Sequence, residues 1–212
     1  MLLALRRVLS LALAIAASCP TWAASAQAVA HYQAGAKLYA QGKLREAEAE
    51  FRAATKVDPT YDAAFTALGN ALYAQHRTAD AVAQWQVAVK LNPRNASAWT
   101  NLSAGLTDLG KLNDALFACK KAIGLNPNSA GAHHNMGRAL YKQKRFSEAI
   151  HEYQNALKLN PNYSPAWLSL GWAYAAQENH AEAVRCFKKY LELNPNPTQC
   201  TCIIKAYIEN YS

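Results

Sequence analysis

A proline recurs every 34 residues along most of this 212-residue chain, and that spacing constrains the fold more than any other feature. The five prolines end short motifs of the LNP or VDP type and are Pro59, Pro93, Pro127, Pro161 and Pro195. A fixed period of this length is the signature of repeat architectures, in which each short unit packs against its neighbours. The spacing therefore predicts one stacked array of five units in place of one or two ordinary globular domains.

Small residues recur at two places in the repeat. The shared proline is counted as position 32, and the five copies are residues 28–61, 62–95, 96–129, 130–163 and 164–197. Position 8 then holds Gly35, Gly69, Ser103, Gly137 and Gly171, and position 20 holds Ala47, Ala81, Ala115, Ala149 and Ala183. Small side chains let two helices approach closely, and bulky residues lie at helical intervals around both positions. Each copy is therefore predicted to be a pair of amphipathic helices.

The expected helix ends carry residue types that suit them. Side-chain oxygens that can cap the first helix stand at or beside three repeat boundaries, at Asn95, Ser129 and Ser164. Position 19, near the start of the second helix, is acidic in every copy, as Glu46, Asp80, Asp114, Glu148 and Glu182. Pro161 is expected to end a second helix, because it drives Asn160 away from helical angles.

These positions together resemble the tetratricopeptide repeat family, whose pattern is W-x2-L-G-x2-Y, then A-x3-F, then P. The fifth copy matches throughout, with Trp167, Leu170, Gly171, Tyr174, Ala183, Phe187 and Pro195. The resemblance covers residues 28 to about 197. It implies an all-α fold, a right-handed α-solenoid of antiparallel helix pairs. The chain departs from the pattern at Ser103, at Cys119, and at Tyr190, where the other copies have alanine.

The tail, residues 198–212, continues the repeat in phase for one helix. Ile204 and Ile208 fall at apolar positions, whereas Lys205 stands where a small residue would admit a second helix. We therefore predict a single C-terminal capping helix that packs against the fifth repeat through its Ile and Tyr residues.

Residues 1–26 have the features of a signal peptide: a basic start, an apolar run and an A-x-A site at Ala24-Ser25-Ala26. The apolar run is too short to span a bilayer. The mature chain is expected to begin at Gln27, in a periplasm or an equivalent extracytoplasmic compartment. Cys19, which follows Ala16-Ala17-Ser18, offers an alternative: lipidation and membrane association.

Charge and cysteine content add little chemistry. The formal net charge of +8 is scattered over helical segments, and export disfavours a nucleic-acid partner. Cys119 occupies an apolar position of the repeat, so a buried role is expected. Cys186 can pair with Cys200 or with Cys202 in an oxidising compartment.

Resemblance to the family implies that the first helices line a concave groove, at positions 2, 5, 6, 9, 12 and 13. The candidate peptide-binding residues there are Tyr39, Asn70, Tyr73, Asn101, His134, Asn135, Arg138, Tyr141 and Trp172. Amides pair with a peptide backbone, and phenols supply apolar area with few rotamers to lose. Thr66 and Gly131 stand where the family's carboxylate clamp has lysines, so a receptor for chaperone tails is not expected.

Enzymatic chemistry is not expected, because the sequence has no HExxH motif and no glycine-rich phosphate loop. We expect no cofactor, no metal and no small-molecule substrate. The sequence thus predicts an exported, non-enzymatic adaptor that binds a protein or peptide as a scaffold or assembly factor for an envelope or membrane complex. The alternative is an assembly factor of a pilus or secretion machine, anchored by a lipid on Cys19.

Overall fold

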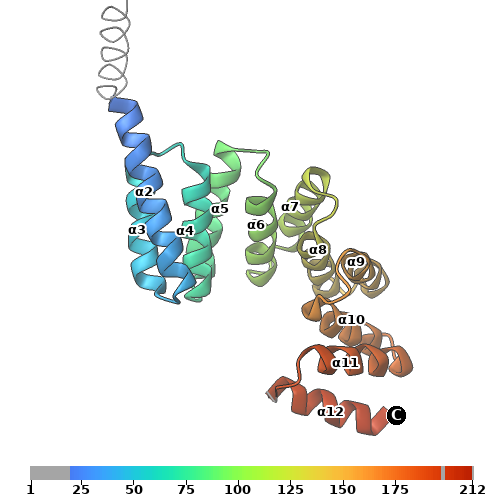
Figure 1. Ribbon diagram of the computed structural model, residues 1–212. Helices are drawn as coiled ribbons and strands as arrows, with labels where there is room; N and C mark the ends of the chain where they lie inside the picture. The colour runs from blue at the N-terminus through green and yellow to red at the C-terminus, as the bar shows by residue number, and fades with distance from the viewer. Residues whose placement is uncertain (1–19, 197–198, 212) are drawn as a thin grey trace, which may run out of the picture. The chain divides into compact units, whose positions relative to one another are not determined.

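The computed structural model describes residues 20–196 and 199–211, and these are helical apart from short connections (Figure 1). No β-strand occurs in those two ranges, so the all-α prediction is confirmed. Cys19 and most of the predicted signal peptide lie outside the described residues. No helix within the described ranges combines the length and apolar character needed to cross a membrane.

Two compact units make up the chain, and the boundary between them follows Pro93. The first unit contains α2 (Pro20–Ala40), α3 (Leu44–Val57), α4 (Asp62–Ala74) and α5 (Thr78–Leu91). Here α2 packs against α3 and α4 packs against α5, so the first two predicted repeats are helix pairs. The predicted cleavage site at residues 24–26 lies within α2.

The second unit contains the other three repeats and the tail helix. Its elements are α6 (Ala96–Asp108), α7 (Leu112–Leu125), α8 (Ala130–Lys142), α9 (Phe146–Leu159), α10 (Ser164–Ala176), α11 (His180–Leu193) and α12 (Gln199–Tyr211). The pairs α6 with α7, α8 with α9, and α10 with α11 are the third, fourth and fifth repeats. First helices also pack against each other, α6 against α8 and α8 against α10.

Within a pair, the small residue at position 8 lies against the bulky residue at position 24. A Cβ atom on Gly137 would meet the ring of Tyr153 at 2.5 Å, which is closer than real Cβ contacts come. The third repeat departs from this pattern at both places, with Ser103 and Cys119, and both side chains are fully buried. The two departures from the family pattern therefore compensate, because a smaller partner leaves room for the serine hydroxymethyl group.

The turn inside each repeat uses one residue with a left-handed backbone, at position 15. These residues are Gly42, His76, Gly110, Lys144 and Glu178, with φ between 60° and 75°. Glycine adopts this conformation freely, whereas the other three side chains adopt it at a cost. The left-handed residue ends the first helix and lets the second fold back on it.

The joint between repeats confirms the expected role of the proline. Asn160 has φ −141° and ψ 94°, so the chain is extended just before Pro161. Asn95 and Ser129 cap their helices, accepting hydrogen bonds from the amides of Ala98 and Ala132. The prediction for Ser164 was wrong: it is the first helical residue of α10, after the N-cap Tyr163, and makes no capping hydrogen bond.

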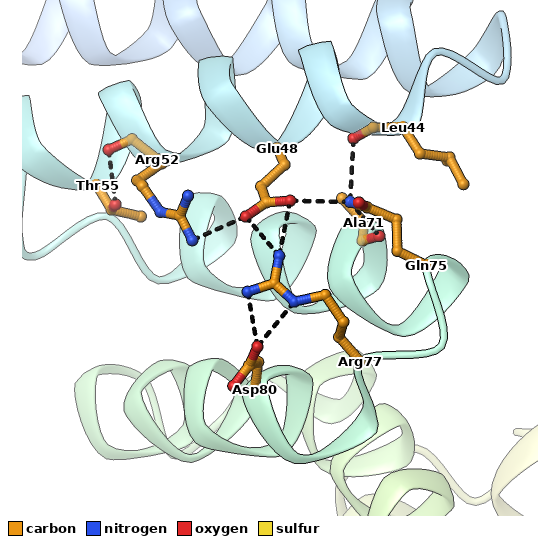
Figure 2. Close-up of polar contacts among 8 residues, drawn as sticks. All are labelled: Leu44, Glu48, Arg52, Thr55, Ala71, Gln75, Arg77 and Asp80. Carbon is orange, nitrogen blue, oxygen red and sulfur yellow. Dashed lines mark hydrogen bonds and ion pairs between the residues drawn. The ribbon is translucent and has the colours of Figure 1, made fainter.

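A buried carboxylate joins the first two repeats. Glu48 occupies position 21, which is apolar in the other copies, as Val82, Leu116, Ile150 and Val184. Figure 2 shows Glu48 of α3 accepting hydrogen bonds from Gln75 at 3.0 Å and from Arg77 at 2.9 Å, with Arg52 at 2.8 Å. Arg77 also reaches Asp80 at 2.6 Å. The network therefore ties α3 to the turn between α4 and α5.

The tail helix α12 packs against α11, as predicted. Ile204 is fully buried in a cluster with Ala183 and Phe187, and Ile208 packs against the same cluster. Tyr190, the departure from alanine in the fifth repeat, belongs to the same contacts. Ile203 differs from the expectation, because 55% of its surface stays exposed.

Candidate functional site

Two of the predicted groove residues of the first unit, Asn70 and Tyr73, contact a buried tryptophan. Trp85 Nε1 donates to Asn70 Oδ1 at 3.1 Å and lies 3.2 Å from the carbonyl oxygen of Thr66. The ring of Tyr73 lies 5.5 Å from the ring of Trp85. Asn70 and Tyr73 therefore hold the core side chain of their own repeat, while each keeps part of its surface open. Tyr39 on α2 is 38% exposed.

In the second unit, three predicted residues come together around a pocket between α8 and α10. The pocket has a volume of about 240 Å³, and its lining residues are Arg138, Tyr141, Lys142, Tyr153, Ser169 and Trp172. Arg138, Tyr141 and Trp172 were predicted. Lys142 and Ser169 were missed, although they stand at positions 13 and 6, which the repeat pattern assigns to the groove. Tyr153 comes from α9, where position 24 predicted only packing.

The pocket presents hydrogen-bond donors between aromatic rings. Arg138 Nη2 donates to Asp108 Oδ1 at 2.6 Å, and Lys142 Nζ donates to the carbonyl oxygen of Thr107 at 2.9 Å. Within the described part of the chain, the other N–H groups of Arg138 have no hydrogen-bond partner. Arg138 and Lys142 are two cations, and Asp108 is the one carboxylate that pairs with either of them in these contacts. The pocket is therefore electropositive. Such a site suits carbonyl and carboxylate oxygens.

His134 contacts Ser169 and Tyr153, which line this pocket, and is buried. Its Nε2 is 3.1 Å from Ser169 Oγ. Burial, followed by the charge of Arg138, lowers the pKa of His134 to about 4. His134 is therefore a neutral link between α8 and α10, and little of its surface can meet a ligand.

Asn135 is buried in the same way, between α6 and α8. Its amide donates to the carbonyl oxygen of Thr100 at 3.0 Å and to Ser103 Oγ at 3.3 Å. Asn101, on α6, is half-buried. A binding role for Asn135 stays a prediction, but its hydrogen bonds join the neighbouring first helices α6 and α8.

Two of the described cysteines, Cys119 and Cys186, lie in the protein interior. Cys119 and Cys186 are buried, and burial raises the pKa of their thiols to about 11 and about 12. Cys202 is exposed, and its pairing with the buried Cys186 stays a prediction. The side chain of Cys200 lies outside the description, and its pairing with Cys186 stays a prediction. No group of three His, Cys, Asp or Glu side chains in the described ranges could hold a metal ion.

Two family models match the chain. Residues 66–130 and 134–196 match a model described as tetratricopeptide repeat, and residues 35–76 match one described as TPR repeat. Together they span the helix pairs of both units. No protein with a curated description matches the chain at a significant level.

Several solved structures share the fold. MamA is 26% identical, with 76% of this chain and 94% of MamA covered and a TM-score of 0.65. PilW, described as a widely conserved type IV pilus biogenesis factor, is 20% identical, with 87% and 85% covered and a TM-score of 0.80. YrrB, described as having an unusual peptide-binding site, is 20% identical, with 86% and 92% covered and a TM-score of 0.65. The likeness to PilW and YrrB shows the fold alone.

Proposed function

Because this chain belongs to the tetratricopeptide repeat family, we propose that it is a non-enzymatic adaptor that binds an extended segment of a partner protein on its first helices. The observation that carries this proposal is the pocket between α8 and α10. Repeat arrays offer long surfaces on one set of helices, and a segment lying there can place one side chain in a pocket.

The chemistry of the pocket fits a peptide. Tyr141 and Trp172 supply rigid aromatic area, which binds apolar side chains at a low cost in rotamer entropy. Arg138 and Lys142 can donate to peptide carbonyls or to an acidic side chain. YrrB, which has this fold, is described as having an unusual peptide-binding site. The site we assign to the partner segment is therefore the face of α8 and α10 around Arg138, Tyr141 and Trp172.

The proposed location follows from the N-terminal residues. The A-x-A site before Gln27 supports an exported adaptor that serves an envelope or membrane complex. Cys19 supports the second candidate, a lipid-anchored assembly factor of a pilus or secretion machine. PilW, which shares the fold, is described as a pilus biogenesis factor. Both candidates use the same binding face.

Site-specific photocrosslinking in the native cell tests the binding face. A photoreactive phenylalanine analogue replaces Lys142 at the pocket in one variant and Lys120 on α7 in another; both side chains are exposed. We expect a covalent adduct with one partner protein from position 142 and none from position 120, with mass spectrometry identifying the adduct. The proposal fails if position 142 gives no adduct, or if position 120 captures the same partner equally well.

A further inference from the structure

A second hollow in the same unit lies outside the proposed binding face, among α9, α10 and α11. It consists of two adjoining pockets of about 450 and 350 Å³, and Trp167 and Arg185 line both of them. The lining residues come chiefly from the second helices of the fourth and fifth repeats. No residue of the pocket between α8 and α10 lines this hollow. The two surfaces can therefore be tested separately.

The floor of this hollow is apolar and held in place. Trp167 Nε1 donates to the carbonyl oxygen of Pro161 at 2.8 Å, which anchors the indole at the joint between repeats. Leu157, Leu170 and Tyr174 line the larger pocket beside it. The indole is therefore a rigid, half-buried aromatic surface of the kind enriched at protein interfaces.

Cations surround the floor. Arg185, Lys188 and Lys189 lie at helical intervals of three and four on α11, and Lys158 lies in the last turn of α9. Of these, Lys189 pairs with Glu192 at 2.8 Å, and Arg185 lies 3.5 Å from Glu182. Lys158 and Lys188 are exposed and have no partner among the described residues. The rim therefore has an excess of positive charge.

The second unit as a whole also carries a positive net charge. From Arg94 onward the sequence contains 13 Lys and Arg against 8 Asp and Glu, a net charge of +5. The sequence before Arg94 contains 9 Lys and Arg against 6 Asp and Glu, a net charge of +3. A positive field over the second unit favours the approach of a negatively charged partner.

The third repeat shows why this hollow is open. Trp99 occupies the same position as Trp167, but the ring of Phe117 lies against it edge-on, with the centroids 6.0 Å apart. The fifth repeat has Arg185 in the place of Phe117, so a cation stands at the rim where the third repeat has an aromatic cover. Lys120 and Lys121 of the third repeat match Lys188 and Lys189 in position and type, and so offer a matched control.

We propose that the hollow around Trp167 is a second docking surface, which binds an acidic segment of a partner protein. The segment places an aliphatic or aromatic side chain on Trp167, and its flanking Asp or Glu side chains meet Lys158, Arg185 and Lys188. A hollow with an apolar floor and a charged rim matches a peptide side chain better than it matches a flat lipid surface. The adaptor would then bind two protein segments at once, one on each set of helices.

Titration of the full chain with a synthetic peptide tests the proposal. The probe is a hexapeptide, blocked at both ends, with a central Leu-Phe pair between two acidic residues on each side. Indole ¹⁵N–¹H signals are recorded and assigned with Trp167→Phe and Trp172→Phe. We expect the peptide to shift the Trp167 signal and to leave the Trp172 signal in place, because Trp172 lines the other site.

Charge reversal supplies the decisive comparison. Lys188→Glu with Lys189→Glu should weaken peptide binding about tenfold or more, whereas Lys120→Glu with Lys121→Glu should change it less than about twofold. Circular dichroism checks that both variants keep their helices. The proposal is overturned if the Trp167 signal does not move, if both double variants lose binding equally, or if only phosphatidylglycerol vesicles shift it. A shift of Trp172 alone would overturn this surface and leave the face of α8 and α10 standing.

Discussion

His134 shows at the scale of one residue how burial decides protonation. Its ring packs against Tyr153 and Tyr163, with centroids 5.7 and 5.3 Å away. Burial and the charge of Arg138 both disfavour the imidazolium, which lowers the pKa of His134 from its ordinary 6.5 to about 4. A neutral histidine therefore packs against residues that line an electropositive pocket.

His134 should make the free energy of unfolding depend on pH. Between pH 6.5 and about 4 the unfolded chain binds a proton at this residue and the folded chain does not, so stability is full above pH 6.5 and falls with acidification. From pH 7.5 to 4.5 the wild type should lose about 2 to 3 kcal/mol more than His134→Gln. Urea unfolding at both values measures this difference. A constant gap between the two proteins would contradict it.

At the scale of the element, the connection between α3, α4 and α5 depends on one carboxylate. Burial favours the neutral form of Glu48, but hydrogen bonds from Gln75 and Arg77, with the charges of Arg52 and Arg77, bring its pKa below the ordinary 4.5. Glu48 is buried, whereas its two arginine partners are roughly half exposed. The carboxylate is therefore the member of the network that cannot be left without partners.

Replacement of Glu48 by glutamine should cost about 1 kcal/mol at pH 7, because charge-assisted hydrogen bonds become neutral ones while the exposed arginines stay solvated. The pKa of Glu48 is lowered in the folded state, so this stabilisation is present above pH 4.5 and is lost as the pH falls through the folded pKa. Chemical unfolding across this range measures it. Glu46→Gln, an exposed change on the same helix, should cost less; an equal loss would argue against the network.

At the scale of the whole molecule, the exposure of the residues around the predicted cleavage site bears on how the chain is processed. Ser25, Ala26 and Gln27 are exposed, and Ala28 is fully buried. Cleavage after Ala26 would therefore leave Ala28 and the residues that follow it in α2 in place. The structure of the first repeat is thus compatible with a mature chain that starts at Gln27.

Intact mass spectrometry of the protein purified from its native cell distinguishes the two routes of export. We expect the mass of residues 27–212, unchanged by Cys19→Ser, because the A-x-A site precedes Gln27. A chain that starts at Cys19 with an added lipid mass, and that disappears in Cys19→Ser, would support the anchored alternative. A mass that includes residues 1–18 would contradict export by either route.

Much of the fold could be predicted from the repeat, because packing inside a helix pair is local. Gly137 and Tyr153 are 16 residues apart, and their types at fixed positions already imply a close helix pair. Capping was predicted less well, since Ser164 and Tyr163 differ by one position and only backbone angles decide which begins the helix. The outcome for Ile203 follows from the same limit: one helical turn carries several apolar residues, and the neighbour covers only some of them.

The sequence by itself determined the number of repeats, their helix pairs and the family, because each depends on periodic contacts over short separations. Only the tertiary structure decided which groove residues are open. His134 and Asn135 share the polar character of Arg138 and Tyr141, yet the first two are buried between neighbouring first helices and the last two line a pocket. Exposure depends on how closely one repeat approaches the next. The side chains at the contact between two repeats set the distance between them. That distance cannot be predicted from a repeat position that all copies share.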